Sequence, residues 1–248
     1  GPTGVETSGA MMEFFTKVLA KDFPTLDVRS VRVILVEAAP RLLGGLSPAS
    51  GDRARRTLSA RGVEVRLGVG VERVDATDDG GVEVRLADGT TIPAGVVVWA
   101  AGVRASPLAE ALGVELTKAG RIVVADDLSV PGHPEVFAVG DIAAARGPAH
   151  GDEPGAVLPQ VAQPAIQGGR HAGRQIARRL EGAATEPFRY RDKGAMATIG
   201  RHDAVAEFPS GRRLTGFAGW VAWLGLHLVY LIGFRTRANV LVNCAWNY

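Results

Sequence analysis

Helical patterns alternate with strand patterns over about the first hundred residues, and this alternation constrains the fold more than any other feature of the sequence. Apolar residues at helical spacing predict a helix over 5–20, which Pro24 ends. The β-branched run 31–37 and the alternating run 63–67 predict strands, and a helix over about 47–62 separates them, with Ser47 or Ser50 as its cap. Strands joined through helices imply a parallel sheet, and hence an α/β fold.

A β-meander and a further buried strand are expected after this first part. Short strands are predicted at 71–74, 82–86 and 90–92, with Asp88-Gly89 as the turn between the last two. The apolar run 95–102 predicts a buried strand that leads into a glycine turn. The remaining expected elements are strands at 122–124 and 136–139, a helix at 161–180, and short strands at 196–199 and 204–208.

The composition is that of a globular protein, and it excludes several kinds of site. The 248 residues are 46% hydrophobic with a net charge of +2, and no basic stripe is interleaved with aromatic residues, so nucleic acid is not an expected partner. The single cysteine, Cys244, excludes an internal disulfide, a zinc cluster and a redox-active Cys-x-x-Cys, and no metal site is expected. The chain opens on Gly1 without a signal peptide, and we expect it to be a fragment with further sequence before it.

The opening residues, Gly1-Pro2-Thr3-Gly4, match the second and third glycines of a G-x-G-x-x-G motif. In that motif a strand-to-helix turn brings backbone N–H groups to a pyrophosphate at the helix N-terminus. Glu37 ends the next strand, where a carboxylate accepts hydrogen bonds from both ribose hydroxyls and repels a 2′-phosphate, so NADH is favoured over NADPH. The alternatives are an ordinary glycine turn at a helix start and a solvated acid at a strand end.

A second local motif joins a strand to a glycine and an acid. The run 136–139 leads directly into Gly140 and Asp141. This segment resembles the one that reaches the flavin in flavoproteins with two dinucleotide-binding domains, and the resemblance assigns Asp141 a hydrogen bond to the ribityl chain of FAD. The same resemblance places the turn at Ala101 and Gly102 near the nicotinamide and flavin rings. The alternatives are an Asp that caps a helix and a glycine turn after any buried strand.

The acceptor motif follows about twenty residues later. Ala162-Gln163-Pro164-Ala165 is similar to the Ala-Gln-x-Ala motif of the type II NADH dehydrogenase family, of which the chain resembles the carboxy-terminal part of an actinobacterial member. The resemblance implies that Ala162, Gln163 and Ala165 line a quinone site, and that Glu6 lies near the flavin, where it relays protons. The alternatives are an ordinary helix start and, for Glu6, an acid in the first helical turn.

The carboxy-terminal region has a different character. In the run 214–234, His227 is the only ionisable residue, and arginines stand on both sides of the run. Aromatic residues in its middle and charge at both ends favour a helix or helical pair that lies in the membrane interface, over 214–237. The alternatives are a buried core helix, an oligomer interface and, as a minority view, a membrane-spanning helix.

The resemblance implies a Rossmann-like NADH-binding domain with a β-meander, as part of a two-dinucleotide-domain flavoprotein fold with a membrane-associated helical tail. The expected domains are 1–104 for NADH, without its first strand; 105–185 as the remnant of the FAD domain; and 186–248 as the membrane anchor. The implied activity is FAD-dependent oxidation of NADH with two-electron reduction of menaquinone or ubiquinone, without proton pumping. The fragment alone is expected to be inactive.

The expected location is peripheral and monotopic, on the cytoplasmic face of the cell inner membrane, and a homodimer is left open. Two rivals also remain open. One is a flavin reductase with a soluble protein acceptor, such as a ferredoxin. The other is a non-catalytic NADH-binding fragment that attaches to the membrane.

Overall fold

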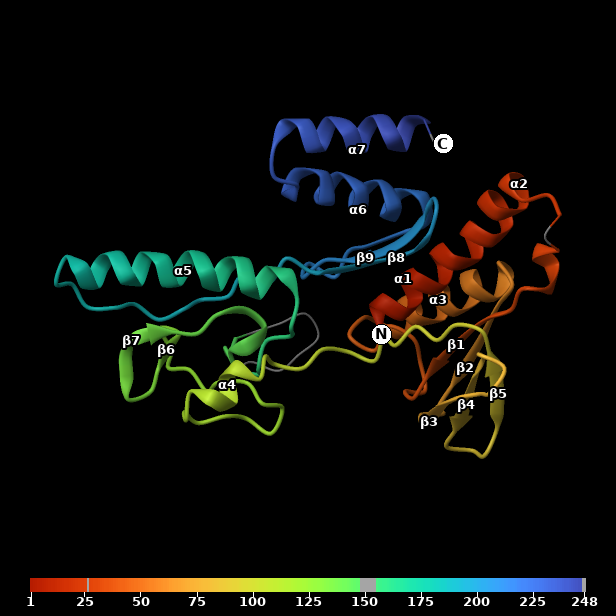
Figure 1. The fold of residues 1–248 in the computed structure, drawn as a ribbon. Helices are drawn as coiled ribbons and strands as arrows, with labels where there is room; N and C mark the ends of the chain where they lie inside the picture. The colour runs from red at the N-terminus through yellow and green to blue at the C-terminus, as the bar shows by residue number, and fades with distance from the viewer. Residues whose placement is uncertain (26, 148–154, 247–248) are drawn as a thin grey trace. The chain divides into compact units, whose positions relative to one another are not determined.

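The computed structural model describes residues 1–25, 27–147 and 155–246, and the chain divides into two compact units (Figure 1). The first unit comprises Gly1–Ala101 and Ala195–Tyr248, and the second is the intervening Gly102–Gly194. The three domains expected from the sequence remain a prediction. The two compact units have other boundaries than these expected domains, because the residues from Ala195 onward pack with the first hundred residues.

A parallel strand pair lies at the centre of the first unit. Strand β1 (Val33–Glu37) pairs with β2 (Val63–Leu67) in register, from Val33 opposite Val63 to Glu37 opposite Leu67. Helix α3 (Pro48–Ala60) connects the two strands, and the Ser47 side chain caps it by accepting a hydrogen bond from the N–H of Ser50. The strand–helix–strand unit expected from the sequence is therefore confirmed.

The first helix runs ahead of this pair. Helix α1 (Pro2–Glu13) continues through the π-helical turn η1 (Phe14–Leu19) into α2 (Ala20–Asp22), and it ends before Pro24, as expected. The short 3₁₀ turn η2 (Val28–Ser30) then leads into β1.

The expected β-meander is confirmed as an antiparallel sheet of β3 (Val71–Ala76), β4 (Val82–Leu86) and β5 (Thr91–Ala94). Gly89 adopts a φ of 84° in the turn between β4 and β5, a conformation that glycine takes without strain. The buried residues of the meander, Val84, Leu86 and Ile92, pack against Ile34 and Val36 of β1. The meander thus covers one side of the parallel pair.

The strand expected over 95–102 is not formed, and this expectation was wrong. Residues 96–100 pair with no strand among the described residues, and Val96 and Trp99 are 73% and 67% exposed. An apolar run becomes a buried strand only when neighbouring strands accept its hydrogen bonds, and the parallel sheet of the described chain contains β1 and β2 alone. The run 122–124 likewise forms only isolated bridges, from Ile122 to Leu116 and to Ala143.

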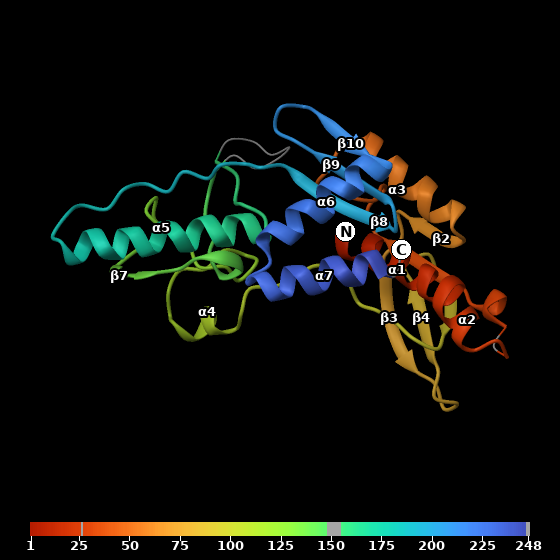
Figure 2. The ribbon, with the colours of Figure 1, turned by 90° about the horizontal axis from the view of Figure 1, so that it is seen from above.

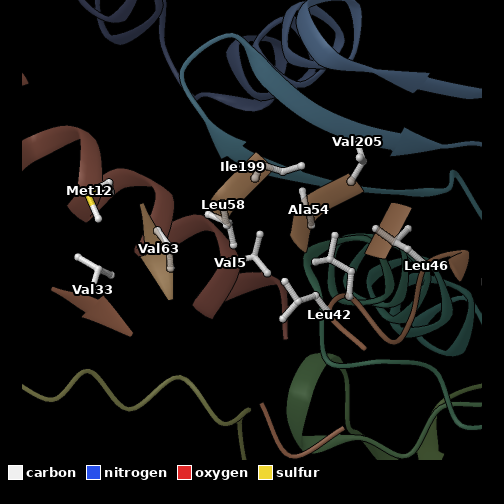
Figure 3. Close-up of a cluster of buried hydrophobic side chains, with 12 residues drawn as sticks. Val5, Met12, Val33, Leu42, Leu46, Ala54, Leu58, Val63, Ile199 and Val205 are labelled. Carbon is white, nitrogen blue, oxygen red and sulfur yellow. The ribbon is translucent and has the colours of Figure 1, made fainter. Parts of the chain in front are cut away.

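A second antiparallel sheet closes the first unit from the other end of the chain. Its strands are β8 (Ala195–Gly200), β9 (Asp203–Glu207) and β10 (Arg213–Thr215), in the order β10–β9–β8. Helix α1 packs on β8, and residues from both ends of the chain share one core, in which Val5, Leu58, Ile199 and Val205 are buried together (Figure 3). This core holds α1 against both sheets.

The apolar tail forms a helical hairpin instead of one continuous helix. Helix α6 (Gly216–Tyr230) and helix α7 (Phe234–Trp246) are separated at 231–233, where Gly233 has a φ of 87° (Figures 1 and 2). Helix α6 packs so closely on β9 that a Cβ at Gly219 would come within 2.6 Å of the Ala204 carbonyl oxygen. Among the described helices, none has both the length and the apolar character needed to cross a membrane.

The second unit is built around helix α5 (Ala162–Leu180), which confirms the helix expected over 161–180. Its small core joins Ile122, Val130 and Ala138 to Ala109 of the short helix α4 (Leu108–Ala111). The strand expected over 136–139 lies earlier than predicted. The structure has the hairpin of β6 (Ser129–Val130) and β7 (His133–Phe137), followed by the 3₁₀ turn η3 (Gly140–Ile142).

Candidate functional site

In the glycine turn at the start of α1, the backbone at Gly1 is open to solvent and the backbone at Gly4 packs tightly on β1. Gly1 is the N-cap of α1, and a Cβ built on it would meet no protein atom within 4 Å, so a ligand can approach this backbone. A Cβ at Gly4 would lie 3.2 Å from Leu35 Cδ1 of β1, so glycine lets the helix pack directly on the strand. These are the parts that the second and third glycines play in a dinucleotide-binding turn. Pro2 lies in the first helical turn, where it suits a helix start.

Glu37 lies beside this turn, at the carboxyl end of β1. Its Oε2 lies 2.6 Å from the backbone nitrogen of Gly1, and its Oε1 accepts a hydrogen bond from the backbone N–H of Ala39 at 3.1 Å. The structure therefore brings Gly1 and Glu37 together, as the motif requires.

A pocket that the sequence did not indicate lies at the carboxyl end of β2, beside the end of β1. It has a volume of about 610 Å³, and its lining includes Leu67, Gly68 and Asp88. The N–H of Gly68 donates to the carbonyl of Ala39, which ties the pocket to the loop after Glu37. Ligands of open α/β sheets bind outside the carboxyl ends of the strands, and this general rule was the available signal.

Glu6 binds a backbone group in the structure. Its Oε1 accepts a hydrogen bond of 3.1 Å from the N–H of Thr198, so the carboxylate links α1 to β8. The alternative of an acid in the first helical turn was wrong, since the first turn of α1 contains no acid. The proton-relay role of Glu6 stays a prediction.

Ala101 and Gly102 lie on an exposed stretch after the meander. Gly102 has a φ of 100°, which favours glycine, and both residues are exposed. Ala100, just before them, reaches the start of α1, because a Cβ at Gly4 would lie 3.9 Å from Ala100 Cβ. Their expected place near the nicotinamide stays a prediction.

In the second unit, the Gly140 turn packs on the first turn of α5. Gly140 has a φ of 73°, and a Cβ built on it would lie 3.4 Å from Ala165 Cβ. The alternative of Asp141 as a helix cap was wrong, because the N-cap of η3 is Val139 and no side chain caps that turn. Asp141 is instead exposed within the turn, with its backbone carbonyl bound by the amide of Gln160 at 3.0 Å. The structure thus brings the flavin motif and the acceptor motif together.

The orientation of Gln163 follows from its neighbours on α5. The amide of Gln167 is fixed at both ends, since its Oε1 accepts from the N–H of Arg191 at 3.0 Å and its Nε2 donates to the carbonyl of Arg191 at 2.9 Å. The same Nε2 lies 3.3 Å from Gln163 Oε1. The amide nitrogen of Gln163 is left as a donor without an acceptor among the described residues. Ala162, at the start of the helix, is exposed beside it.

Comparison with known protein families gives one extended match. The family model described as pyridine nucleotide-disulphide oxidoreductase matches residues 1–169. The chain is 43% identical to the type II NADH:quinone oxidoreductase Ndh of Mycobacterium tuberculosis, over 98% of this chain and 51% of that protein. It is 37% identical to the type II NADH:quinone oxidoreductase of Staphylococcus haemolyticus, over 87% of this chain and 51% of that protein. The chain spans about half the length of these curated relatives.

Solved structures agree on the fold. The structure of NDH2 from Plasmodium falciparum in complex with NADH superposes with a TM-score of 0.78, covering 98% of this chain and 63% of that chain. At 16% identity this likeness shows the fold alone. It confirms the α/β architecture expected from the sequence.

Proposed function

This chain belongs to the pyridine nucleotide-disulphide oxidoreductase family, and from that premise we propose that it serves the FAD-dependent oxidation of NADH with reduction of a membrane quinone. The single observation that carries the proposal is the meeting of the open Gly1 turn with the Glu37 carboxylate at the carboxyl end of β1. The names of the relatives, type II NADH:quinone oxidoreductases, support the choice of quinone as acceptor.

NADH fits the first unit on three counts. The backbone at Gly1 is open for a pyrophosphate at the N-terminus of α1. The Glu37 carboxylate at the end of β1 accepts from the ribose hydroxyls and disfavours a 2′-phosphate. The pocket of about 610 Å³ at the end of β2 has the size of a small-molecule site and suits the adenine.

FAD and the quinone fit the second unit. The left-handed backbone at Gly140 allows close approach to a ligand, and Asp141 is exposed for a hydrogen bond to the ribityl chain. Gln163 offers its amide nitrogen to a quinone carbonyl, and Ala162 and Ala165 leave room for a flat ring. Bound FAD supplies the redox chemistry between NADH and quinone, while these residues position the reactants.

The tail supports a site that opens to the membrane. The turn between α6 and α7 exposes Ile232 and Phe234, at 92% and 86%, and Arg235 follows directly. Apolar side chains of this kind bind at headgroup depth, and arginine favours anionic lipid. We extend the proposal to a peripheral, monotopic enzyme on the cytoplasmic face of the inner membrane that reduces menaquinone or ubiquinone, with dimerisation left open.

The decisive experiment measures NADH oxidation by the full-length protein with FAD and a short-chain quinone. Gln163→Ala should lower quinone-dependent turnover about tenfold or more, because the hydrogen-bond donor to the quinone carbonyl is lost. Turnover with a soluble dye is the control and should not change. NADH oxidation with the dye but none with the quinone would reject the proposal that quinone is the acceptor and would favour a soluble acceptor. A purified protein without bound flavin would favour the non-catalytic alternative.

A further inference from the structure

A second pocket lies in the second unit, away from the turn at Gly140. It has a volume of about 450 Å³ and lies between helix α5 and the segment 186–189. Two of its arginines, Arg170 and Arg174, stand one turn apart on the same face of α5, and Arg189 approaches from the opposite wall. The pocket therefore gathers positive charge from two separate segments of the chain.

The three arginines are not engaged elsewhere in the described chain. No ion pair or side-chain hydrogen bond involves the guanidinium of Arg170, Arg174 or Arg189 among the described residues. The acid of the pocket, Glu186, is already neutralised by Arg178, whose Nη1 lies 3.1 Å from its Oε1. Arg170, Arg174 and Arg189 thus have no paired acid among the described residues.

His171 contributes a buried ring to the lining of the pocket, where it is 4% exposed. The N–H of Glu186 donates to Gln175 Oε1 at 2.8 Å, which fixes the amide and turns its Nε2 toward His171 Nδ1, at 3.5 Å. The neutral ring carries one proton, so one of its two nitrogens donates. Among the described residues, Nε2 has no hydrogen-bond partner.

Burial without a partner is costly for such a polar nitrogen, and native proteins rarely tolerate it unless a ligand or water completes the site. Burial lowers the pKa of His171; the backbone of Glu186 opposes this, and the charge of Arg174 adds to it. His171 is therefore neutral near pH 7 and offers a single N–H. The remaining positive charge of the pocket comes from the arginines.

We propose that this pocket binds an organic phosphate, held by the guanidinium groups of Arg170, Arg174 and Arg189, with His171 as a further donor at the base. A phosphate has several acceptor oxygens around one centre, which suits guanidinium forks that converge from two walls. Phe188 adds an apolar wall, and 450 Å³ falls in the range of sites for whole small molecules. The proposal does not depend on the quinone reaction.

Two sources supply this chemistry, a soluble phosphate ester and the headgroup of an anionic phospholipid. The full-length protein is titrated calorimetrically with glycerol 3-phosphate, and its binding to vesicles of phosphatidylglycerol is compared with that to phosphatidylcholine. Arg174→Gln is the test variant, because Arg174 is exposed and its loss leaves the fold intact. Arg104→Gln, an exposed arginine outside the pocket, removes the same charge as the control.

Arg174→Gln should weaken the binding of glycerol 3-phosphate about tenfold, the loss of one charge-assisted hydrogen bond, while Arg104→Gln leaves it unchanged. A loss confined to the soluble ester identifies a soluble ligand. A matching loss on phosphatidylglycerol vesicles identifies the lipid headgroup, and both support the site. Binding of neither probe, or equal weakening in the two variants, overturns the proposal, whatever the quinone activity of the protein.

Discussion

Replacing Gly9 with alanine should push α1 away from β8 and destabilise the first unit. A Cβ at Gly9 would lie 2.4 Å from the carbonyl oxygen of Ile199 and 2.9 Å from its carbonyl carbon. Ordinary contact begins at about 3.4 Å, so helix and strand must separate by about 1 Å. A backbone carbonyl in a paired strand cannot swing aside as a flexible side chain would.

The expected cost follows from two opposing terms. Overpacking of a core costs about 1–3 kcal/mol, and the rigid backbone favours the upper part of that range. Alanine is a better helix former than glycine by about 1 kcal/mol, which offsets part of the cost. The net loss in the free energy of unfolding should be about 1–2 kcal/mol. The same displacement should weaken the hydrogen bond from Thr198 to Glu6, because it spans the same two elements.

Urea unfolding followed by tryptophan fluorescence tests this prediction. All four tryptophans of the chain belong to the first unit, so the signal reports that unit. The midpoint of Gly9→Ala should fall by roughly 0.5–1 M. The matched control is Gly225→Ala on α6 of the same unit, where a Cβ would meet nothing within 4 Å and the midpoint should stay or rise. A Gly9→Ala midpoint at or above that of the unchanged protein would refute the close packing of α1 on β8.

Three further predictions concern the sites. Glu37→Gln should raise the KM for NADH about tenfold and reduce the preference for NADH over NADPH, since a charged acceptor for the ribose hydroxyls is lost. Steady-state kinetics with both nucleotides measure this preference, and an unchanged preference argues against the ribose role of Glu37. Ile232→Asp should weaken sedimentation with anionic vesicles about tenfold or more, whereas Leu112→Asp, also exposed but in the second unit, should not; equal effects would remove the tail from the membrane contact. Burial lowers the pKa of His171 in the folded state below 6.5, so the stability of the second unit should fall as the pH falls from about 6.5 toward that pKa, and should stay constant at lower pH. Unfolding followed by circular dichroism should show that His171→Gln removes this pH dependence, and the same pH profile in both proteins would contradict the prediction.

Local patterns were enough to predict most of the elements in the first unit. The strands β1 and β2 and the meander with its Asp88-Gly89 turn follow from periodicity and turn residues, as does helix α5 of the second unit. The run 95–102 was predicted wrongly, because burial of a strand depends on neighbours that its own sequence does not specify. The tail was expected to be a helix or a helical pair, and the structure has the pair, but the position of the break at Gly233 was not predicted, since a single glycine in an apolar run does not require a turn.

The site residues divide along the same line. Gly4 and Glu37 could be predicted as candidates from the glycine motif and the order of the elements, because the glycine turn and the end of the next strand recur together in dinucleotide-binding folds. The contact of Glu6 joins residues 192 positions apart, and no local pattern predicts it. The phosphate pocket was missed for the same reason. Arg170 and Arg174 are visible as a helical pair, but only the return of the chain brings Arg189 to them.

The first unit is split in sequence by the whole of the second, and this sets the order in which the protein can acquire its structure. Strand β8 begins at Ala195, so Val5 and Leu58 have no partner in Ile199 until most of the chain has left the ribosome. The continuous segment 102–194 can fold earlier. During that time the core residues among the first hundred remain exposed, because β8 and β9 have not yet been made. Contacts of such long sequence separation fold slowly. The core of the first unit is therefore completed only after residues 195–205 have been synthesised.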